Sequence, residues 1–172
     1  MYVEADPKNG YDLWAFDGDA RRAIPFRRTA KNELLPALSP DGRWVAYTSD
    51  ESDREEVYAE VFPGGGSRVQ LSVDGGTEPI WSANGQEVFY RSAGRLMSVA
   101  VQAGSALSAA VPTTLFEAAF VSSAAFGPPA YAATADGQHF YFLRSPPAAP
   151  TPRRITVIVN WLEEFKKRVA TK

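Results

Sequence analysis

Residues 38–62, LSPDGRWVAYTSDESDREEVYAEVF, decide the fold of this chain. A polar turn, SPDG at residues 39–42, precedes an apolar run at residues 43–49. An acidic loop at residues 50–55 leads to a second apolar run at residues 56–62. Short apolar runs between turn residues are typical of strands, and Asp-Gly favours a hairpin because glycine adopts positive φ at little cost. The stretch therefore predicts consecutive antiparallel strands.

The same pattern occurs three times along the chain. The copies are PALSPDGRWVAY at residues 36–47, PIWSANGQEVFY at 79–90 and YAATADGQHFYF at 131–142. Each has a hydroxyl residue, one spacer, Asp-Gly or Asn-Gly, and then β-branched or aromatic residues. The glycines of successive copies are 43 and 52 residues apart. The shorter interval fits a repeat of about 40–45 residues with four strands per unit, and the longer one has room for an inserted loop.

Four-stranded sheets that repeat radially form a β-propeller. The sequence therefore predicts an all-β fold, a partial β-propeller of four-stranded antiparallel blades within residues 1–159. Propellers typically have four to eight blades, so we expect either the C-terminal part of a larger propeller or self-association that completes one. The expected units are a partial blade at residues 11–30 with strands at 11–16 and 23–26, full blades at 33–73 and 77–117, and a last blade at 130–159 with a third strand at 154–159.

Residues 160–172 have a different pattern and predict a short C-terminal amphipathic helix. Asn160 is a suitable N-cap, and Glu163 follows at the spacing of a capping box. Trp161, Phe165 and Val169 fall on one stripe of the helix. We expect this stripe to fold back on the last blade. The alternative is a helix that binds a partner or a membrane surface.

These motifs carry a family resemblance. The segments SPDGRWVAYTSD, EVYAEVF and DLWAFDGD resemble the WD-repeat-like β-propeller repeat of TolB-type proteins. The segments TEPIWSANGQEVFYRSAGRLMSVAV and ITVIVNWLEEFKKRV are similar to propellers that some bacteria fuse behind a serine/threonine protein kinase domain. The resemblance implies a sensor or interaction module in the periplasm or elsewhere outside the cytoplasm. Two copies depart from the repeat, because Ala83-Asn84 and Ala135-Asp136 replace Pro-Asp.

Composition excludes several classes of function. Nucleic-acid binding requires a clustered basic surface, and the net charge of −2 does not indicate one. The chain has no cysteine, which removes disulfides, thiolate zinc sites and cysteine nucleophiles. No stretch of about 18 apolar residues predicts a membrane span, and residues 1–7 do not resemble a signal peptide.

The sequence offers few candidates for catalysis. The chain contains neither the motifs of a protein kinase nor the Gly-x-Ser-x-Gly elbow of a serine hydrolase. Residues 64–66 are three glycines that we interpret as a turn between strands. The single histidine, His139, aligns with Trp44 and Glu87 in the other copies, and we interpret it as a surface or core side chain. Asp41 and Asp136 occupy turn positions where Asp is favoured for its hydrogen bonds to the backbone.

The acidic loop at residues 50–56 is the one candidate for a metal, since calcium prefers oxygen ligands. The loop lacks the spacing of an EF-hand, and Arg54 opposes a cation, so we expect a solvated hairpin loop and assign no metal, cofactor or catalytic residue. Aromatic side chains recur on the expected strands and should mostly fill the gaps between blades, an aromatic sugar or peptide surface being the alternative. They are Trp14, Trp44, Tyr47, Tyr58, Trp81, Phe89, Tyr90 and Tyr141.

These observations favour a non-catalytic propeller that binds a protein or peptide partner. The alternative is the accessory propeller of a prolyl-oligopeptidase-type serine peptidase whose catalytic domain is absent from this chain. A lyase-type propeller predicts several histidines or carboxylates that converge on the channel, and a single histidine argues against it.

Overall fold

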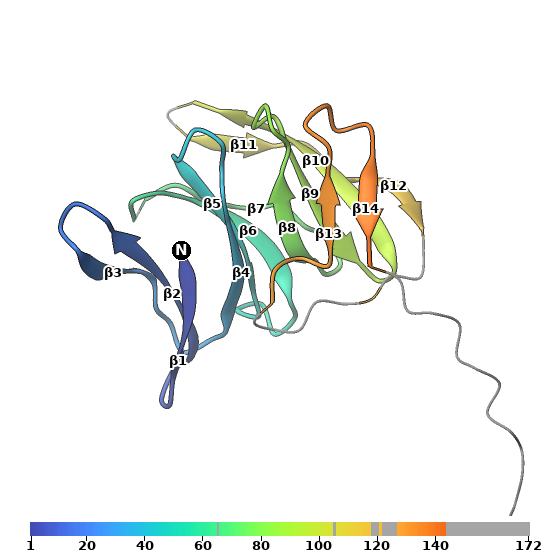
Figure 1. Cartoon of the computed structure of the whole chain (residues 1–172). Helices are drawn as coiled ribbons and strands as arrows, with labels where there is room; N and C mark the ends of the chain where they lie inside the picture. The colour runs from blue at the N-terminus through green and yellow to red at the C-terminus, as the bar shows by residue number, and fades with distance from the viewer. Residues whose placement is uncertain (65, 105, 118–120, 122–126, 144–172) are drawn as a thin grey trace, which may run out of the picture.

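The computed structural model describes residues 1–64, 66–104, 106–117, 121 and 127–143. These residues form strands and connecting turns in four antiparallel sheets that follow one another along the chain (Figure 1). Within this part of the chain no helix has the length and apolarity needed to cross a membrane. The prediction of an all-β propeller fold is confirmed. The third strand expected at residues 154–159 and the helix expected at 160–172 lie outside the described residues.

The first sheet contains β1 (Tyr2–Asp6), β2 (Gly10–Asp17) and β3 (Arg22–Arg27) in that order. The sequence predicted only the pair that corresponds to β2 and β3. The additional strand β1 pairs with β2, with Tyr2 opposite Trp14. Its sequence YVEAD lacks the alternation of a half-buried strand, because only Val3 packs against the core.

The second sheet is a regular four-stranded meander. It contains β4 (Glu33–Leu38), β5 (Trp44–Ser49), β6 (Glu56–Val61) and β7 (Arg68–Gln70) in chain order. This sheet places the acidic loop between β5 and β6 and the glycine-rich turn between β6 and β7.

The third sheet has an outer edge that is divided in two. It contains β8 (Thr77–Trp81), β9 (Glu87–Ser92), β10 (Arg95–Ala103), β11 (Leu107–Ala109) and β12 (Thr113–Glu117). Because β10 is nine residues long, its end pairs with β11 and its beginning with β12. The sequence predicted a single outer strand here.

The fourth sheet consists, within the described residues, of β13 (Tyr131–Ala133) and β14 (Phe140–Phe142). It is joined to the third sheet by buried polar groups. Glu78 forms a 2.7 Å ion pair with Arg91 and accepts a hydrogen bond from the backbone N–H of Ala130 at 2.7 Å. The Tyr131 hydroxyl donates to the backbone carbonyl of Glu78 at 2.9 Å.

The two middle sheets are covered on both faces. In β5, Trp44 and Ala46 belong to the core shared with the third sheet, whereas Val45 and Tyr47 belong to the core shared with the first sheet. In β9, Tyr90 faces the second sheet while Phe89 faces the fourth. Successive side chains of a strand point to opposite faces, so every residue of β5 is buried.

Most of the recurrent aromatic side chains fill the spaces between sheets, as predicted. The exception is Tyr141, which is 67% exposed on β14. Trp14 and Trp81 are half-buried, and the fully or nearly fully buried ones are Trp44, Tyr47, Tyr58, Phe89 and Tyr90.

The three copies of the repeat form the same turn. In the first copy Ser39 Oγ donates to Asp41 Oδ1 at 2.6 Å and accepts from the backbone N–H of Trp44 at 2.9 Å. The backbone N–H of Gly42 donates to the Ser39 carbonyl at 2.9 Å. Asn84 and Asp136 take the place of Asp41 in the other copies and accept equivalent hydrogen bonds.

Positive φ in these turns falls on the glycine alone. The values are 72° at Gly42, 70° at Gly85 and 69° at Gly137. As predicted for Asp41 and Asp136, the acidic or amide residue of each turn accepts a hydrogen bond from the backbone.

A group of charged side chains lies between the first and second sheets. Arg27 pairs with Glu51 at 3.3 Å and with Glu60 at 3.5 Å, and Arg28 pairs with Asp12 at 3.2 Å. Glu33 is fully buried among these groups. Its Oε1 accepts a 2.6 Å hydrogen bond from Thr29, and its Oε2 has no partner. Burial therefore raises the pKa of Glu33 to about 7.

Substitution of Gly42 by alanine tests the turn. No atom lies within 4 Å of the Cβ that Gly42→Ala adds, so the cost is the positive φ alone. We expect the free energy of unfolding to fall by about 1–2 kcal/mol in urea denaturation. Gly18 has equally open surroundings without a positive φ, so Gly18→Ala is the matched control and should leave stability nearly unchanged. Equal effects of the two variants would contradict the assigned role of Gly42.

Glu33 should make stability depend on pH. Because its pKa is raised on folding from 4.5 to about 7, the folded state binds the proton more tightly. The stabilisation is fully present below about pH 4.5 and is lost as the pH rises to about 7, with a total near 3 kcal/mol. We expect Glu33→Gln to remove this component of the pH profile of unfolding. The exposed Glu4→Gln is a charge-matched control, and a pH dependence that persists unchanged in Glu33→Gln would disprove the assignment.

Candidate functional site

The acidic loop predicted as a possible metal site is held by basic side chains and hydrogen-bond donors. Glu51 receives both terminal nitrogens of Arg68 at 2.5 Å, and Lys31 lies 2.7 Å from Asp53. These cations lower the pKa of Glu51 and of Asp53. Asp50 accepts hydrogen bonds from the backbone and side-chain nitrogens of Asn32 at 2.8 and 2.6 Å.

The last acid of this loop, Glu56, is fully buried. Arg54, Ser72 and the backbone N–H of Gly75 donate to its carboxylate, the Arg54 Nε at 2.8 Å. The loop thus ties the second sheet to the segments before and after it. In the described part of the chain no group of three or more His, Cys, Asp or Glu side chains is placed to hold a metal ion.

The other singled-out residues are turn and surface positions. His139 is exposed, and its backbone takes part in the third copy of the turn. Hydrogen bonds from Ser39 and Thr134 lower the pKa of Asp41 and Asp136, as expected for turn acceptors. Gly64 and Gly66 have positive φ in the connection between β6 and β7.

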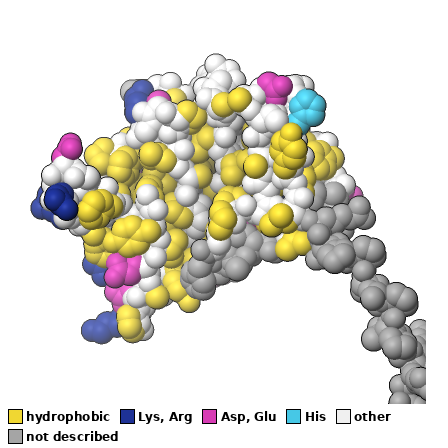
Figure 2. All heavy atoms as spheres, viewed as in Figure 1, with side chains coloured by type: hydrophobic (Ala, Val, Ile, Leu, Met, Phe, Trp, Pro, Cys, Tyr) yellow, Lys and Arg dark blue, Asp and Glu magenta, His cyan; other side chains and the backbone are white. Residues whose placement is uncertain are grey.

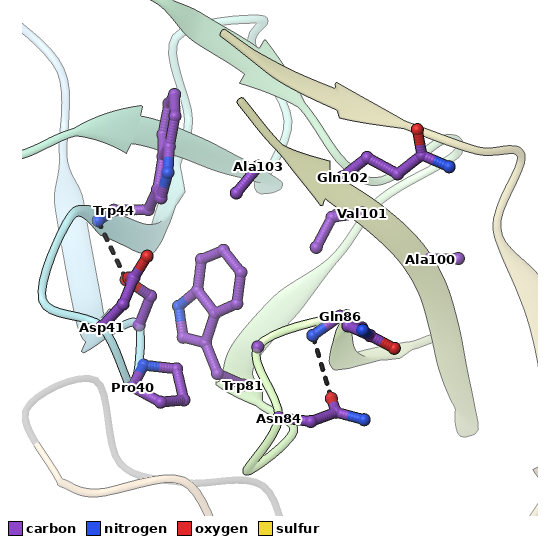
Figure 3. Close-up of a pocket in the computed structure, with 12 residues that line it drawn as sticks. Pro40, Asp41, Trp44, Trp81, Asn84, Gln86, Ala100, Val101, Gln102 and Ala103 are labelled. Carbon is purple, nitrogen blue, oxygen red and sulfur yellow. Dashed lines mark hydrogen bonds between the residues drawn. The ribbon is translucent and has the colours of Figure 1, made fainter. Parts of the chain in front are cut away.

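A pocket lies between the second and third sheets (Figure 3). Its volume is about 550 Å³, within the range of roughly 300–1,000 Å³ typical of small-ligand sites. It lies where the turns of the first two copies of the repeat approach each other, beside the end of β10. The lining residues are Ser39, Pro40, Asp41, Trp44, Trp81, Asn84, Gly85, Gln86, Ala100, Val101, Gln102 and Ala103. We call it the inter-blade pocket.

Two indole rings form its apolar walls. Trp81 stands in the middle of the lining residues in Figure 3, and its Nε1–H donates to the backbone carbonyl of Ala37 at 3.0 Å, which fixes the ring across the two sheets. Trp44 is 1% exposed, and its Nε1–H has no hydrogen-bond partner. The pocket therefore has a fixed aromatic surface, whereas the Trp44 Nε1–H is buried away from solvent.

Polar side chains with planar ends form the rim. They belong to Asp41, Asn84, Gln86 and Gln102, all of which are exposed, and in Figure 3 the amide ends of Gln86 and Gln102 extend away from Trp81. Both hydrogen bonds to Asp41 end on Oδ1, so Oδ2 has no partner among the described residues. Arg43 donates to the carbonyl of Gly104 at 3.1 Å and links the second sheet to the turn after β10.

The sequence did not predict this pocket. Its two tryptophans were interpreted as core side chains, and Gln102 carried no signal. One signal was present, because the residue after the turn glycine is glutamine in two of the three copies, Gln86 and Gln138.

Comparisons with known proteins agree with this architecture. No protein-family model matches the chain. It is 37% identical over 65 residues to the Tol-Pal system protein TolB of Hahella chejuensis, covering 38% of this chain and 15% of that protein. It is 29% identical over 79 residues to the uncharacterized peptidase YuxL of Bacillus subtilis, covering 45% of this chain and 12% of that protein. The chain thus spans less than a sixth of the length of these curated relatives.

The fold resembles that of a solved structure. The crystal structure of TolB from Acinetobacter baumannii superposes with a TM-score of 0.57 at 19% sequence identity. The match covers 81% of this chain and 33% of that protein. Together with the repeated turns and the succession of antiparallel sheets, it shows that this chain has a TolB-type β-propeller fold.

Proposed function

We propose that this chain is a non-catalytic binding module that recognises a protein or peptide partner. It would act as part of a larger TolB-like or kinase-linked bacterial protein, in the periplasm or elsewhere outside the cytoplasm. The likeness to TolB proteins supports a binding role and an extracytoplasmic location. No cofactor is needed for this role.

The observation that carries the proposal is the open edge of β1. In the second sheet the strand β4 lies at one edge and β7 at the other, whereas the first sheet has only three strands and β1 pairs only with β2 within the described residues. By the resemblance of β2 and β3 to the last two strands of a repeat, the position beside β1, which no strand of the described residues occupies, is that of the first strand. An unpaired strand edge accepts an extended segment through backbone hydrogen bonds.

The surroundings of this edge suit such an addition. Figure 2 shows hydrophobic side chains over much of the visible face in the region of β1, β2 and β4. Tyr2 on β1 is 39% exposed, and Ala5 is also exposed. A second copy of the chain, a strand from elsewhere in a longer protein, or a partner peptide would complete the sheet in the same manner.

Self-association tests the availability of this edge. In sedimentation velocity we expect the chain to associate as its concentration rises, because the edge of β1 pairs with a strand of another copy. Ala5→Lys should shift the equilibrium towards the monomer, since charged residues on an edge strand oppose pairing. Ala23→Lys lies on the opposite edge strand, β3, is equally exposed and serves as the matched control. A compact monomer at every concentration would argue against the proposal.

A second function is favoured by the match to YuxL, which is named a peptidase. The chain would then be the accessory propeller of a prolyl-oligopeptidase-type serine peptidase. The complete reading frame discriminates the two functions. A hydrolase domain with a Gly-x-Ser-x-Gly elbow in the same frame supports the peptidase, and a kinase domain supports the kinase-linked module.

The absence of catalysis in this chain itself can be tested directly. The sequence contains no Gly-x-Ser-x-Gly elbow, and its single histidine, His139, is exposed. We therefore expect no covalent labelling by a fluorophosphonate probe, with a known serine hydrolase as the positive control and heat-denatured chain as the negative one. Labelling of the folded chain above that of the denatured chain would show an activated serine and overturn the non-catalytic proposal.

A further inference from the structure

The inter-blade pocket presents an aromatic ring and a carboxylate that are both held in place. Trp81 is half-buried in the middle of the lining residues, and its hydrogen bond to the Ala37 carbonyl at 3.0 Å fixes the ring. Asp41 lines the same pocket from the turn of the first copy (Figure 3). Its Oδ1 accepts from Ser39 Oγ at 2.6 Å and from the backbone N–H of Arg43 at 3.1 Å. A ligand in the pocket therefore meets two groups whose positions folding has already set.

The charge of the lining favours a cation. The hydrogen bonds from Ser39 and from the backbone N–H of Arg43 lower the pKa of Asp41, so its carboxylate is ionised at neutral pH. Asp41 Oδ2 has no partner among the described residues. Asp41 is the one charged side chain of the lining, and the guanidinium of the neighbouring Arg43 donates to the Gly104 carbonyl at 3.1 Å. The carboxylate therefore repels a phosphate or carboxylate ligand, and of the remaining classes a cation alone gains an ion pair with it.

The indole ring determines which kind of cation fits the pocket. A metal ion prefers several oxygen ligands, and in the described part of the chain no three His, Cys, Asp or Glu side chains are placed to hold one. An alkylammonium group is instead attracted to the face of a tryptophan, and its methylene stem packs on apolar surface. Pro40 and Ala103 supply apolar lining for such a stem. The amide ends of Gln86 and Gln102 extend away from Trp81 and leave the space beside the ring open (Figure 3).

We propose that the inter-blade pocket binds the ammonium group of a lysine side chain in a peptide partner. The ammonium group packs on the indole of Trp81 and donates to Asp41 Oδ2. Lysine fits better than arginine, because the bidentate pair that favours arginine needs both carboxylate oxygens and Oδ1 already accepts two hydrogen bonds.

The inference rests on the proposed function, since it names one chemical feature of the partner. The site is separate from the edge of β1. It is lined by residues of the second and third sheets and their turns, so it does not depend on how the first sheet is completed.

The probes are N-acetyl-lysine methylamide and its uncharged counterpart N-acetyl-norleucine methylamide, at millimolar concentration and matched ionic strength. In ¹⁵N-labelled chain, the indole N–H signal of Trp81, assigned with Trp81→Phe, reports on the pocket. We expect the lysine probe to shift this signal along a saturable binding curve, while the signal of Trp14 stays in place. The norleucine probe should bind several-fold more weakly. If the lysine probe causes no shift, or if the two probes bind equally, the ammonium assignment is wrong.

Asp41→Asn removes the charge and keeps the turn. Asn84 already forms the equivalent turn in the second copy, where it accepts from Ser82 Oγ at 2.8 Å and from the backbone N–H of Gln86 at 2.9 Å. We expect Asp41→Asn to weaken binding of the lysine probe about 2–5-fold, the contribution of an exposed ion pair. Asp136→Asn makes the same change in the turn of the third copy, outside the pocket, and should leave the affinity unchanged.

Two further outcomes would overturn the inference. An equal loss of affinity in Asp136→Asn would show an effect of overall charge and no specific site at Asp41. Tighter binding of n-butylammonium than of the capped lysine would make the pocket a site for a small amine instead of a peptide. The proposed function is tested separately, because Ala5→Lys can shift self-association at the edge of β1 whether or not the lysine probe binds.

Discussion

The burial of β5 on both faces is the constraint on which the rest of the structure depends. Trp44 and Ala46 are committed to one neighbouring sheet and Val45 and Tyr47 to the other. A strand in this position has no solvent face, so its polar residues need partners. Thr48 and Ser49 have them, in Thr77 Oγ1 at 3.5 Å and in the backbone N–H of Glu51 at 3.2 Å. The second sheet thereby fixes the positions of the first and the third.

The hydrogen bonds of the turn explain why the repeat tolerates a change at one of its positions. The turn needs a hydroxyl group that accepts a hydrogen bond from the backbone N–H two residues after the glycine, where the next strand begins. It also needs a carboxylate or amide oxygen that accepts a hydrogen bond from this hydroxyl group. Ser39 with Asp41 and Ser82 with Asn84 meet both needs. Proline at the position of Pro40 only presets φ, so its replacement by Ala83 leaves the hydrogen bonds in place.

The sequence predicted what local chemistry determines. The all-β fold and the three turns follow from alternating apolar runs and from the Asp-Gly and Asn-Gly pairs, which act within a few residues. Strand β1 was not predicted, because Val3 is its one residue that packs against the core and the strand therefore lacks an alternating pattern. The ion pair between Glu51 and Arg68 was also not predicted, because these residues are 17 positions apart and come together only when the second sheet forms. The acidic loop, considered as an isolated segment, was therefore predicted to be a solvated hairpin loop.

The inter-blade pocket could not be predicted for a related reason. Its walls come from two turns and from the end of β10, so it exists only once two sheets are packed. That packing is held by the hydrogen bond from Trp81 to Ala37 and by the bond from Arg43 to Gly104, which bridge the second and third sheets. A ligand that enters a pocket fixed in this way does not have to order its walls. Most of the entropic cost of forming the site has already been met by folding, which leaves more of the contact free energy for affinity.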